Sequence, residues 1–246
     1  MNAVSRLRAR SAHGVSGAIR GGNAYEPHVE RQLRAVLRPG MTFVDVGANI
    51  GYHTFLAASL VGPTGRVVAF DASSENCRML LLSRLRNDAS HVDIRPVALD
   101  RETGVALLGH HIGTNAGLAE NDATSIARGD RDVVVARRFD DEVDAPVHVV
   151  KVDVEGAELR VLEGATRTLE RDRPVVVMEF SCEMVERVSG VDARDALGFL
   201  TDRGYRLSVI EKPSGRLVPC ASPVTLLEDW GEAGRIEDLL FVPEDA

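Results

Sequence analysis

The chain has 246 residues, enough for one large α/β domain with a full hydrophobic core, and its 44% hydrophobic and 27% charged residues are typical of a globular protein. Its net charge of −8, from 29 basic and 37 acidic residues, argues against nucleic acid as a partner, because proteins that hold phosphates usually carry a basic surface. Three widely spaced cysteines indicate neither a disulfide framework nor a thiolate zinc site, and no apolar run suits a bilayer span or a signal peptide, so we expect a cytoplasmic protein without a membrane partner.

The chain is expected to begin with a flexible N-terminus over residues 1–22, which are rich in Arg, Ser, Ala and Gly. Residues 23–246 are predicted to form a single domain. Its first part, residues 23–40, has apolar residues at helical spacing, and we expect this helical segment to act as a lid. The dipeptide Pro39-Gly40 ends the helix and leads into a first strand over 42–46.

Strands and helices then alternate along the chain. The pattern predicts strands at 66–70, 92–99, 147–152, 175–178, 205–210 and 239–242, with helices at 52–61, 74–85, 157–169 and 193–203. This alternation is typical of a doubly wound α/β fold, with a mostly parallel sheet covered by helices on both faces. Residues from about 104 to 145 interrupt it, and we interpret them as an insertion of loops and short strands; long insertions of this kind are often functional.

The most informative segment is 43–54, in which a short apolar strand passes into a Gly-x-Asn-x-Gly loop and then a helix. Gly47 and Gly51 can adopt backbone angles closed to other residues and let a ligand approach the main chain. Asp71 follows Gly51 by 20 positions, which places it at the end of the neighbouring strand. A carboxylate there can accept hydrogen bonds from both ribose hydroxyls of an adenosine group.

Two classes of adenosine ligand are weighed. A nicotinamide-binding turn usually reads Gly-x-Gly-x-x-Gly, whereas Tyr52 and His53 stand here where the third glycine would admit a diphosphate. The loop therefore favours S-adenosylmethionine as the cofactor. A nicotinamide-dependent oxidoreductase is the alternative enzyme, and a catalytically inactive S-adenosylmethionine-binding module is the alternative without catalysis.

A second group of charged residues marks the exit of the strand at 147–152. Lys151, Asp153 and Glu155 alternate along the chain and would face one side, and Glu179 ends the neighbouring strand. We expect Asp153 or Glu179 to act as the general base, with Asp153 preferred, and Lys151 or His53 to orient the substrate. An internal ion network that only fixes the strand exit is the competing interpretation. Because no ligand spacing distinguishes a metal site, none is predicted.

These segments, at 44–52, 68–71 and 150–158, resemble the FkbM-type methyltransferases. The resemblance implies a class I S-adenosylmethionine-dependent methyltransferase fold, Rossmann-like, with a seven-stranded sheet whose last strand is antiparallel. It implies O-methylation of a hydroxyl on a small molecule or sugar, in secondary-metabolite (natural product) or glycan biosynthesis. The family usually has Glu followed by Pro where this chain has Asp71-Ala72. By position, the cofactor would be held by Asp45, Gly47, Asn49, Gly51, Asp71, Ala72, Ala98 and Leu99.

The partner is expected to be a small molecule that presents a hydroxyl acceptor, and a homo-oligomer is left open. Specificity is assigned to the lid and the insertion, where sequence pattern says least. The residues expected to contact the substrate are Tyr25, Glu26, His53, Asn115 and Glu155.

Overall fold

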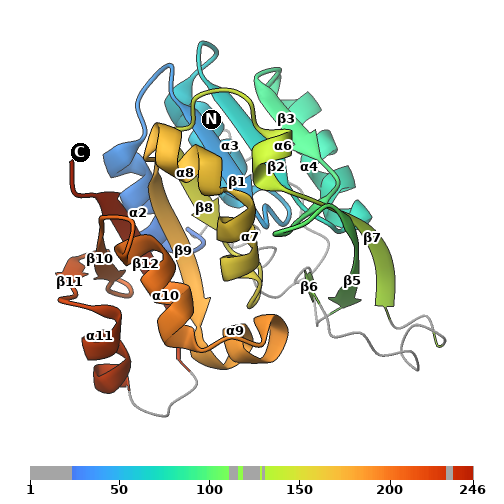
Figure 1. Ribbon diagram of the computed structural model, residues 1–246. Coiled ribbons are helices and arrows are strands. Elements are labelled where there is room, and N and C mark those ends of the chain that lie inside the picture. Colours follow the sequence, from blue (N-terminus) through green and yellow to red (C-terminus); the bar gives the residue numbers. More distant parts are fainter. Residues whose placement is uncertain (1–23, 111–115, 119–127, 129–130, 231–234, 246) are drawn as a thin grey trace.

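The computed structural model describes residues 24–110, 116–118, 128, 131–230 and 235–245 (Figure 1). The N-terminus expected to be flexible, residues 1–22, and the expected substrate contact Asn115 both lie outside the described residues. In the part of the chain that is described, no helix is long and apolar enough to cross a membrane.

A large sheet forms the centre of the molecule (Figure 1). Five parallel strands lie side by side in the order β3 (Val92–Arg95), β2 (Arg66–Phe70), β1 (Thr42–Val46), β8 (Val149–Val152) and β9 (Val175–Ser181). Strand β12 (Ile236–Pro243) pairs antiparallel with β9, and β10 (Tyr205–Ile210) pairs with β12. The short strand β11 (Leu217–Pro219) adds an eighth strand to the seven expected, because the chain turns back at 211–216 and pairs antiparallel with β10.

Helices cover both faces of this sheet. One face packs against α2 (Pro27–Val36), α3 (Tyr52–Val61) and α4 (Ser74–Asn87). The other packs against α7 (Glu158–Gly164), α8 (Thr166–Asp172), α9 (Cys182–Ser189), α10 (Ala193–Thr201) and α11 (Pro223–Trp230). Along β1, Phe43 belongs to the first core and its neighbours Val44 and Val46 to the second, as expected for a strand buried on both faces. The doubly wound α/β fold is confirmed.

A second, four-stranded sheet occupies part of the expected insertion. Its order is β4 (Ala98–Leu99), β7 (Arg131–Arg137), β5 (Gly104–His110) and β6 (Ala116–Leu118), and the short helix α6 (Phe139–Glu142) follows it. The single strand predicted over 92–99 is therefore two strands, because the chain leaves the large sheet after Arg95 and β4 pairs with β7 instead.

The helix predicted over 157–169 is also two helices. The carboxylate of Asp140 accepts hydrogen bonds from the backbone N–H groups of Arg167 and Thr168, at 2.8 and 2.9 Å. These bonds satisfy free donors in the first turn of α8, so α8 has its own N-terminus and does not continue α7. Helices α9 and α11 were not predicted; α9 follows β9 without an intervening loop.

The turn between β1 and α3 brings two loops into direct contact. Gly47 has φ +79°, and a Cβ there would lie 1.8 Å from the carbonyl oxygen of Asp153 in the loop after β8. The sequence analysis attributed this glycine to ligand approach. The structure adds a second reason, since only glycine lets the loops after β1 and β8 pack against each other.

Replacing Gly47 with alanine should destabilise the protein by roughly 2–5 kcal/mol, because the left-handed backbone and the collision with Asp153 both oppose the methyl group. Gly190→Ala is the matched control: its φ of +67° and ψ of 25° are left-handed, but nothing lies within 4 Å of its Cβ position, so it should cost only about 1–2 kcal/mol. Urea denaturation measures both, and equal losses would contradict the packing argument.

Candidate active site

A cavity lies at the carboxyl edge of the large sheet, where ligands bind in open α/β folds. Phe70, Val97 and Leu108 give it apolar walls, and Asp153 also lines it. The structure brings together here five of the eight residues predicted to bind the cofactor: Gly47, Asp71, Ala72, Ala98 and Leu99.

Asp71 links the Gly-x-Asn-x-Gly loop to the start of α4. One carboxylate oxygen accepts a hydrogen bond from the backbone N–H of Asn49 and the other from that of Ser73, both at 2.8 Å. The side-chain amide of Asn76 donates to the same carboxylate, at 3.2 and 3.3 Å. Burial raises the pKa of Asp71 to about 6, although these hydrogen bonds lower it. Asn76 is a contributor that the sequence analysis missed.

The other three predicted cofactor residues are not among those that line the cavity. Asn49 shapes the loop, since its side-chain oxygen accepts from the backbone N–H of Ile50 at 2.8 Å. A Cβ on Gly51 would meet Leu80 at 2.6 Å, so this glycine serves packing. Asp45 is buried below the loop and accepts a hydrogen bond of 2.6 Å from the Thr54 hydroxyl.

Lys151 is the buried cation of the site. Its ammonium lies 2.7 Å from a carboxylate oxygen of Asp153, and Lys151 faces Asp45 in the register of β1 and β8. Burial lowers the pKa of Lys151, but the carboxylates of Asp153, Asp45 and Glu26 together outweigh that effect and raise it. Lys151 therefore stays charged, and it fixes the carboxylate of Asp153 at the wall of the cavity.

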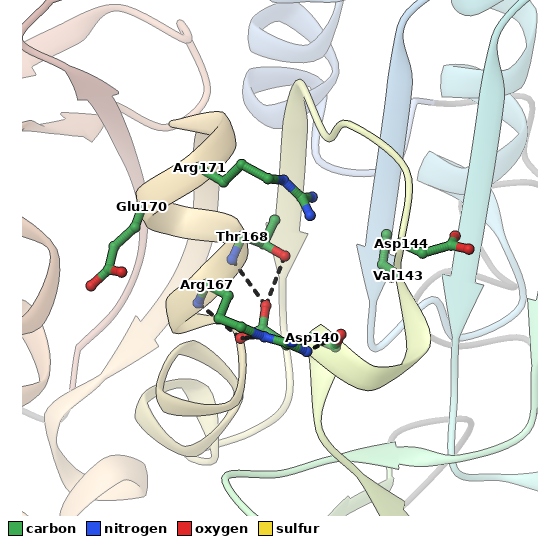
Figure 2. Close-up of a pocket in the computed structure, with 7 residues that line it drawn as sticks. All are labelled: Asp140, Val143, Asp144, Arg167, Thr168, Glu170 and Arg171. Atoms are coloured by element: carbon green, nitrogen blue, oxygen red, sulfur yellow. Dashed lines mark hydrogen bonds and ion pairs between the residues drawn. The ribbon is translucent and has the colours of Figure 1, made fainter.

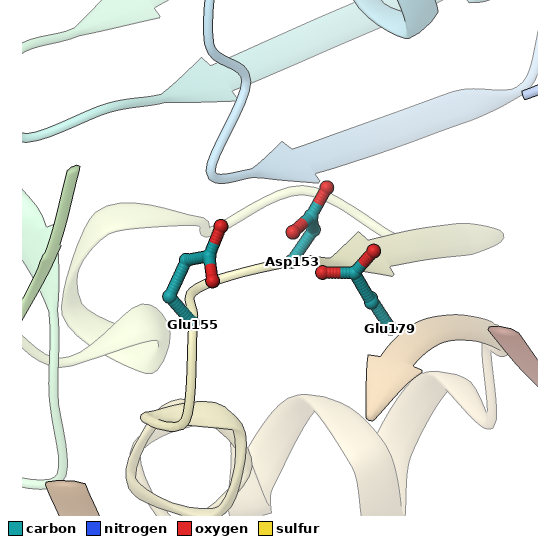
Figure 3. A group of neighbouring side chains, drawn as sticks. All are labelled: Asp153, Glu155 and Glu179. Atoms are coloured by element: carbon teal, nitrogen blue, oxygen red, sulfur yellow. The ribbon is translucent and has the colours of Figure 1, made fainter. Parts of the chain in front are cut away.

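Three carboxyl groups meet beside the cavity (Figure 3). Oxygens of Asp153, Glu155 and Glu179 all lie within 4.8 Å of one another. Burial, Asp153 and Asp238 raise the pKa of Glu179 well above its ordinary value, so this group holds its proton at neutral pH. Carboxylate oxygens are donors for hard cations, but three acidic groups alone do not define a metal site.

A second cluster lies under the segment that leads into α2. The ring of Tyr25 packs against Tyr52 and His53, at centroid distances of 5.8 and 6.1 Å. The hydroxyl of Tyr52 donates to Glu30 at 2.8 Å. Neither Tyr52 nor His53 is among the residues that line the cavity. Tyr52 turns toward Glu30 of α2 and His53 toward Tyr25 and Glu26, so the crowding of a diphosphate inferred from the sequence stays a prediction.

His53 and Glu26 complete this cluster. The Nε2 atom of His53 lies 3.8 Å from a carboxylate oxygen of Glu26 and has no hydrogen-bond partner. Burial and then the charge of Lys151 lower the pKa of His53, so its ring is neutral. Tyr25, Glu26 and His53, all predicted to contact the substrate, are thus brought together.

The sequence analysis missed a third group of polar residues. Asp238 on β12 accepts hydrogen bonds from His28 of α2, at 2.7 Å, and from Lys212, at 3.0 Å. It also pairs with Glu179 in the register of β12 and β9. The acidic pair Glu237 and Asp238 at the start of an apolar strand is a signal that could have drawn attention to Asp238, but its partners lie too far away in the sequence to be identified.

A different surface pocket lies near the start of β8 (Figure 2). Asp140, which lines it, caps α8, and Asp172, next to the lining residue Arg171, accepts from the backbone N–H of Val147 at 2.9 Å. The ion pair between Arg171 and Asp172 is 2.6 Å long. None of the predicted site residues lines this pocket.

Glu158, at the start of α7, is buried with its charge uncompensated. One oxygen accepts from the backbone N–H of Gly156 at 2.9 Å, and the other has no partner. Burial raises its pKa from 4.5 to about 7. The folded protein therefore favours the protonated acid.

The model of the methyltransferase FkbM domain family matches residues 45–207, more than half of the chain. An arsenite methyltransferase from Halobacterium salinarum is 38% identical over 61 residues, which are 25% of this chain and 16% of that protein.

Two solved structures share the fold. The methyltransferase FkbM from Methylobacillus flagellatus KT has a TM-score of 0.50 and 16% identity over 97% of this chain, which spans only 56% of that protein. A structure from Clostridium thermocellum, described as that of a candidate rRNA-methylase, has a TM-score of 0.54 and 12% identity, covering 87% of this chain and 93% of the other. Only the second name states a molecule acted on, and at 16% and 12% identity the likeness concerns the fold and not the acceptor.

The raised pKa of Glu158 predicts a pH dependence of stability. The unfolded chain loses this proton near pH 4.5 and the folded chain near pH 7, so the free energy of unfolding falls as the pH rises between them. At about 1.36 kcal/mol per pKa unit, the loss from this one group is at most about 3 kcal/mol. Glu158→Gln should remove this part of the decline in urea titrations at pH 4.5 and 7.5, and exposed Glu102→Gln should not. An unchanged slope in Glu158→Gln would contradict the assignment.

Proposed function

This chain belongs to the methyltransferase FkbM domain family, and from that premise we propose that it transfers a methyl group from S-adenosylmethionine to a hydroxyl oxygen of a small molecule or sugar. The observation that carries the proposal is the cavity in which Asp71, Ala98 and Leu99 lie on the same walls as Asp153. Family membership argues against the nicotinamide-dependent alternative.

The cavity suits the adenosine part of the cofactor. A carboxylate offers about four lone-pair sites, so Asp71 can accept from ribose hydroxyls while it holds the loop. Ala98 and Leu99, with Phe70 and Leu108, supply the apolar surface that a purine needs. S-Adenosylmethionine supplies an already activated methyl group, and neither a metal nor a redox group is required for that chemistry.

The residues at the strand exit would hold the acceptor. Asp153 lies where the cavity meets the buried carboxyl groups, and Lys151 keeps it in one position. From there its carboxylate can accept a hydrogen bond from the acceptor hydroxyl. Positioning of this kind can contribute roughly 7–11 kcal/mol to a well-oriented reaction. Glu155 and protonated Glu179 would contact other polar groups of the acceptor.

The chemistry of the site also supports a neutral small molecule rather than a nucleic acid. The carboxylates of Asp153, Asp45 and Glu26 act on Lys151, and Glu155 lies beside Asp153, so a phosphate would meet more negative than positive charge there. Biosynthesis of a natural product or glycan is the setting that we propose for such an acceptor.

The direct test is a transfer assay. The purified chain would be incubated with S-adenosylmethionine and a panel of hydroxylated probes: monosaccharides, amino sugars, simple alcohols and phenols, with RNA and arsenite as comparisons outside the proposed acceptor class. We expect S-adenosylhomocysteine and an O-methylated product, detected by mass spectrometry, with at least one hydroxylated probe. Product formed only from RNA or arsenite would contradict the proposed acceptor class, and no binding of S-adenosylmethionine in calorimetry would contradict the cofactor.

Asp71→Ala should weaken S-adenosylmethionine binding about 10- to 100-fold, since hydrogen bonds to a charged group contribute about 1.5–3 kcal/mol each. Isothermal titration calorimetry measures the change. The exposed Asp202, remote from the cavity, provides the control variant Asp202→Ala, whose affinity should match that of the parent chain. An unchanged affinity in Asp71→Ala would show that ribose is held elsewhere.

A further inference from the structure

Glu26 has an unusual backbone conformation for its residue type. It occupies the N-cap position of α2 with φ 48° and ψ 63°, in the left-handed region, and its side chain makes no capping hydrogen bond. Residues other than glycine rarely adopt these backbone angles, and such strain persists only where the surrounding structure enforces it. Here the strained backbone directs a carboxylate inward, and the side chain is 16% exposed.

The side chain that faces Glu26 is that of His53, which has a buried nitrogen without a hydrogen-bond partner. His53 is 5% exposed, and its Nε2 atom, 3.8 Å from the Glu26 carboxylate, has no hydrogen-bond partner. Leaving a buried polar atom without a partner is unfavourable. A hydroxyl placed between the two can donate to the carboxylate and accept from an Nε2–H group, so a hydroxyl-bearing ligand would satisfy both.

The charges around Glu26 also suit it to accept a proton. Its carboxylate is influenced by Lys151 and Asp153 of the β8 exit, Asp238 of β12, Glu179 of β9 and the neighbouring Tyr25. Burial raises the pKa of Glu26 to about 7, with Lys151 opposing the rise. A base near this value is well matched to neutral pH.

The other acidic groups are less suited to that role. The carboxylate of Asp153 is already engaged by the ammonium of Lys151 at 2.7 Å. Glu179 already holds a proton at neutral pH. Among the carboxyl groups near Asp153, Glu26 combines an ionisation near neutrality with an unsatisfied neighbour.

We propose that Glu26 is the catalytic residue that takes the proton from the acceptor hydroxyl, with His53 as its partner in binding that hydroxyl. The inference rests on the proposed methyl transfer. As the hydroxyl oxygen forms its bond to the methyl carbon, the carbon–sulfur bond breaks, its electron pair stays on sulfur, and the hydroxyl proton moves to the Glu26 carboxylate. Asp153 and Lys151 then serve to position the acceptor.

The first test reads the ionisation of Glu26 without an acceptor. The full chain, labelled with ¹³C at the glutamate side-chain carboxyl carbon, would be titrated by NMR from pH 4 to 9. Glu26 and Glu158 are both expected to give signals that titrate near pH 7 in the parent chain, and one of these two signals should be absent in Glu26→Gln. If both signals survive in Glu26→Gln, or if the signal lost titrates near the ordinary value for glutamate, the proposal is overturned.

The second test uses the hydroxylated probe with the highest turnover in the transfer assay. Glu26→Gln should lower kcat about 10²- to 10⁴-fold, the range of general-base effects, and remove the rise in rate through pH 7. Glu26→Asp should restore part of the rate together with the pH dependence. Glu30→Gln is the matched control, since Glu30 is a partly buried acid of α2 bonded to Arg34 and Tyr52. This variant should keep the rate and the pH profile of the parent chain.

The two hypotheses fail differently. If the parent chain binds no S-adenosylmethionine in calorimetry, the proposed function fails. If the parent chain and Glu26→Gln both bind it and transfer methyl groups at equal rates with equal pH profiles, the function stands and the role of Glu26 is overturned.

Discussion

The buried ammonium of Lys151 is the charge around which the site is organised. Lys151 is 3% exposed, and an unpaired cation at such depth would be strongly destabilising. Asp45 on β1, Asp153 at the exit of β8 and Glu26 before α2 compensate it. These partners come from distant parts of the chain, so satisfying one charge requires the two central strands and the N-terminal segment to pack together. The same requirement carries Asp153 and Glu26 to the site.

This charge group separates two regions of different chemistry. On one side is the cavity with apolar walls, where Asp71 is the acid proposed to meet a ribose. On the other are Tyr25, Glu26 and His53, held down by α2, whose His28 bonds to Asp238 at 2.7 Å. Asp153 belongs to both regions. A methyltransferase needs such an arrangement, because the methyl donor and the acceptor hydroxyl must meet in line. Here the ion pair between Lys151 and Asp153 fixes the point where the two regions meet.

The sequence was sufficient for features that depend on local pattern. Strand and helix periods predicted the doubly wound sheet, and the spacing from Gly51 placed Asp71 at the end of the neighbouring strand, where it lines the cavity. Features that depend on long-range contacts could not be predicted. Asp140 separates α7 from α8 across more than 25 residues, and His28 meets Asp238 across 210. The direction of the His53 side chain and the protonation of Glu179 follow from burial, which the sequence does not reveal.

The central claim is that Asp153 joins a cofactor cavity to a buried acceptor region. A crystal structure of the protein soaked with S-adenosylhomocysteine tests it most directly. The account predicts the ribose on Asp71, the adenine beside Ala98 and Leu99, and the sulfur directed toward Asp153. Density for the ligand at another place, such as the pocket beside α8, or with its sulfur directed away from Asp153, would contradict it.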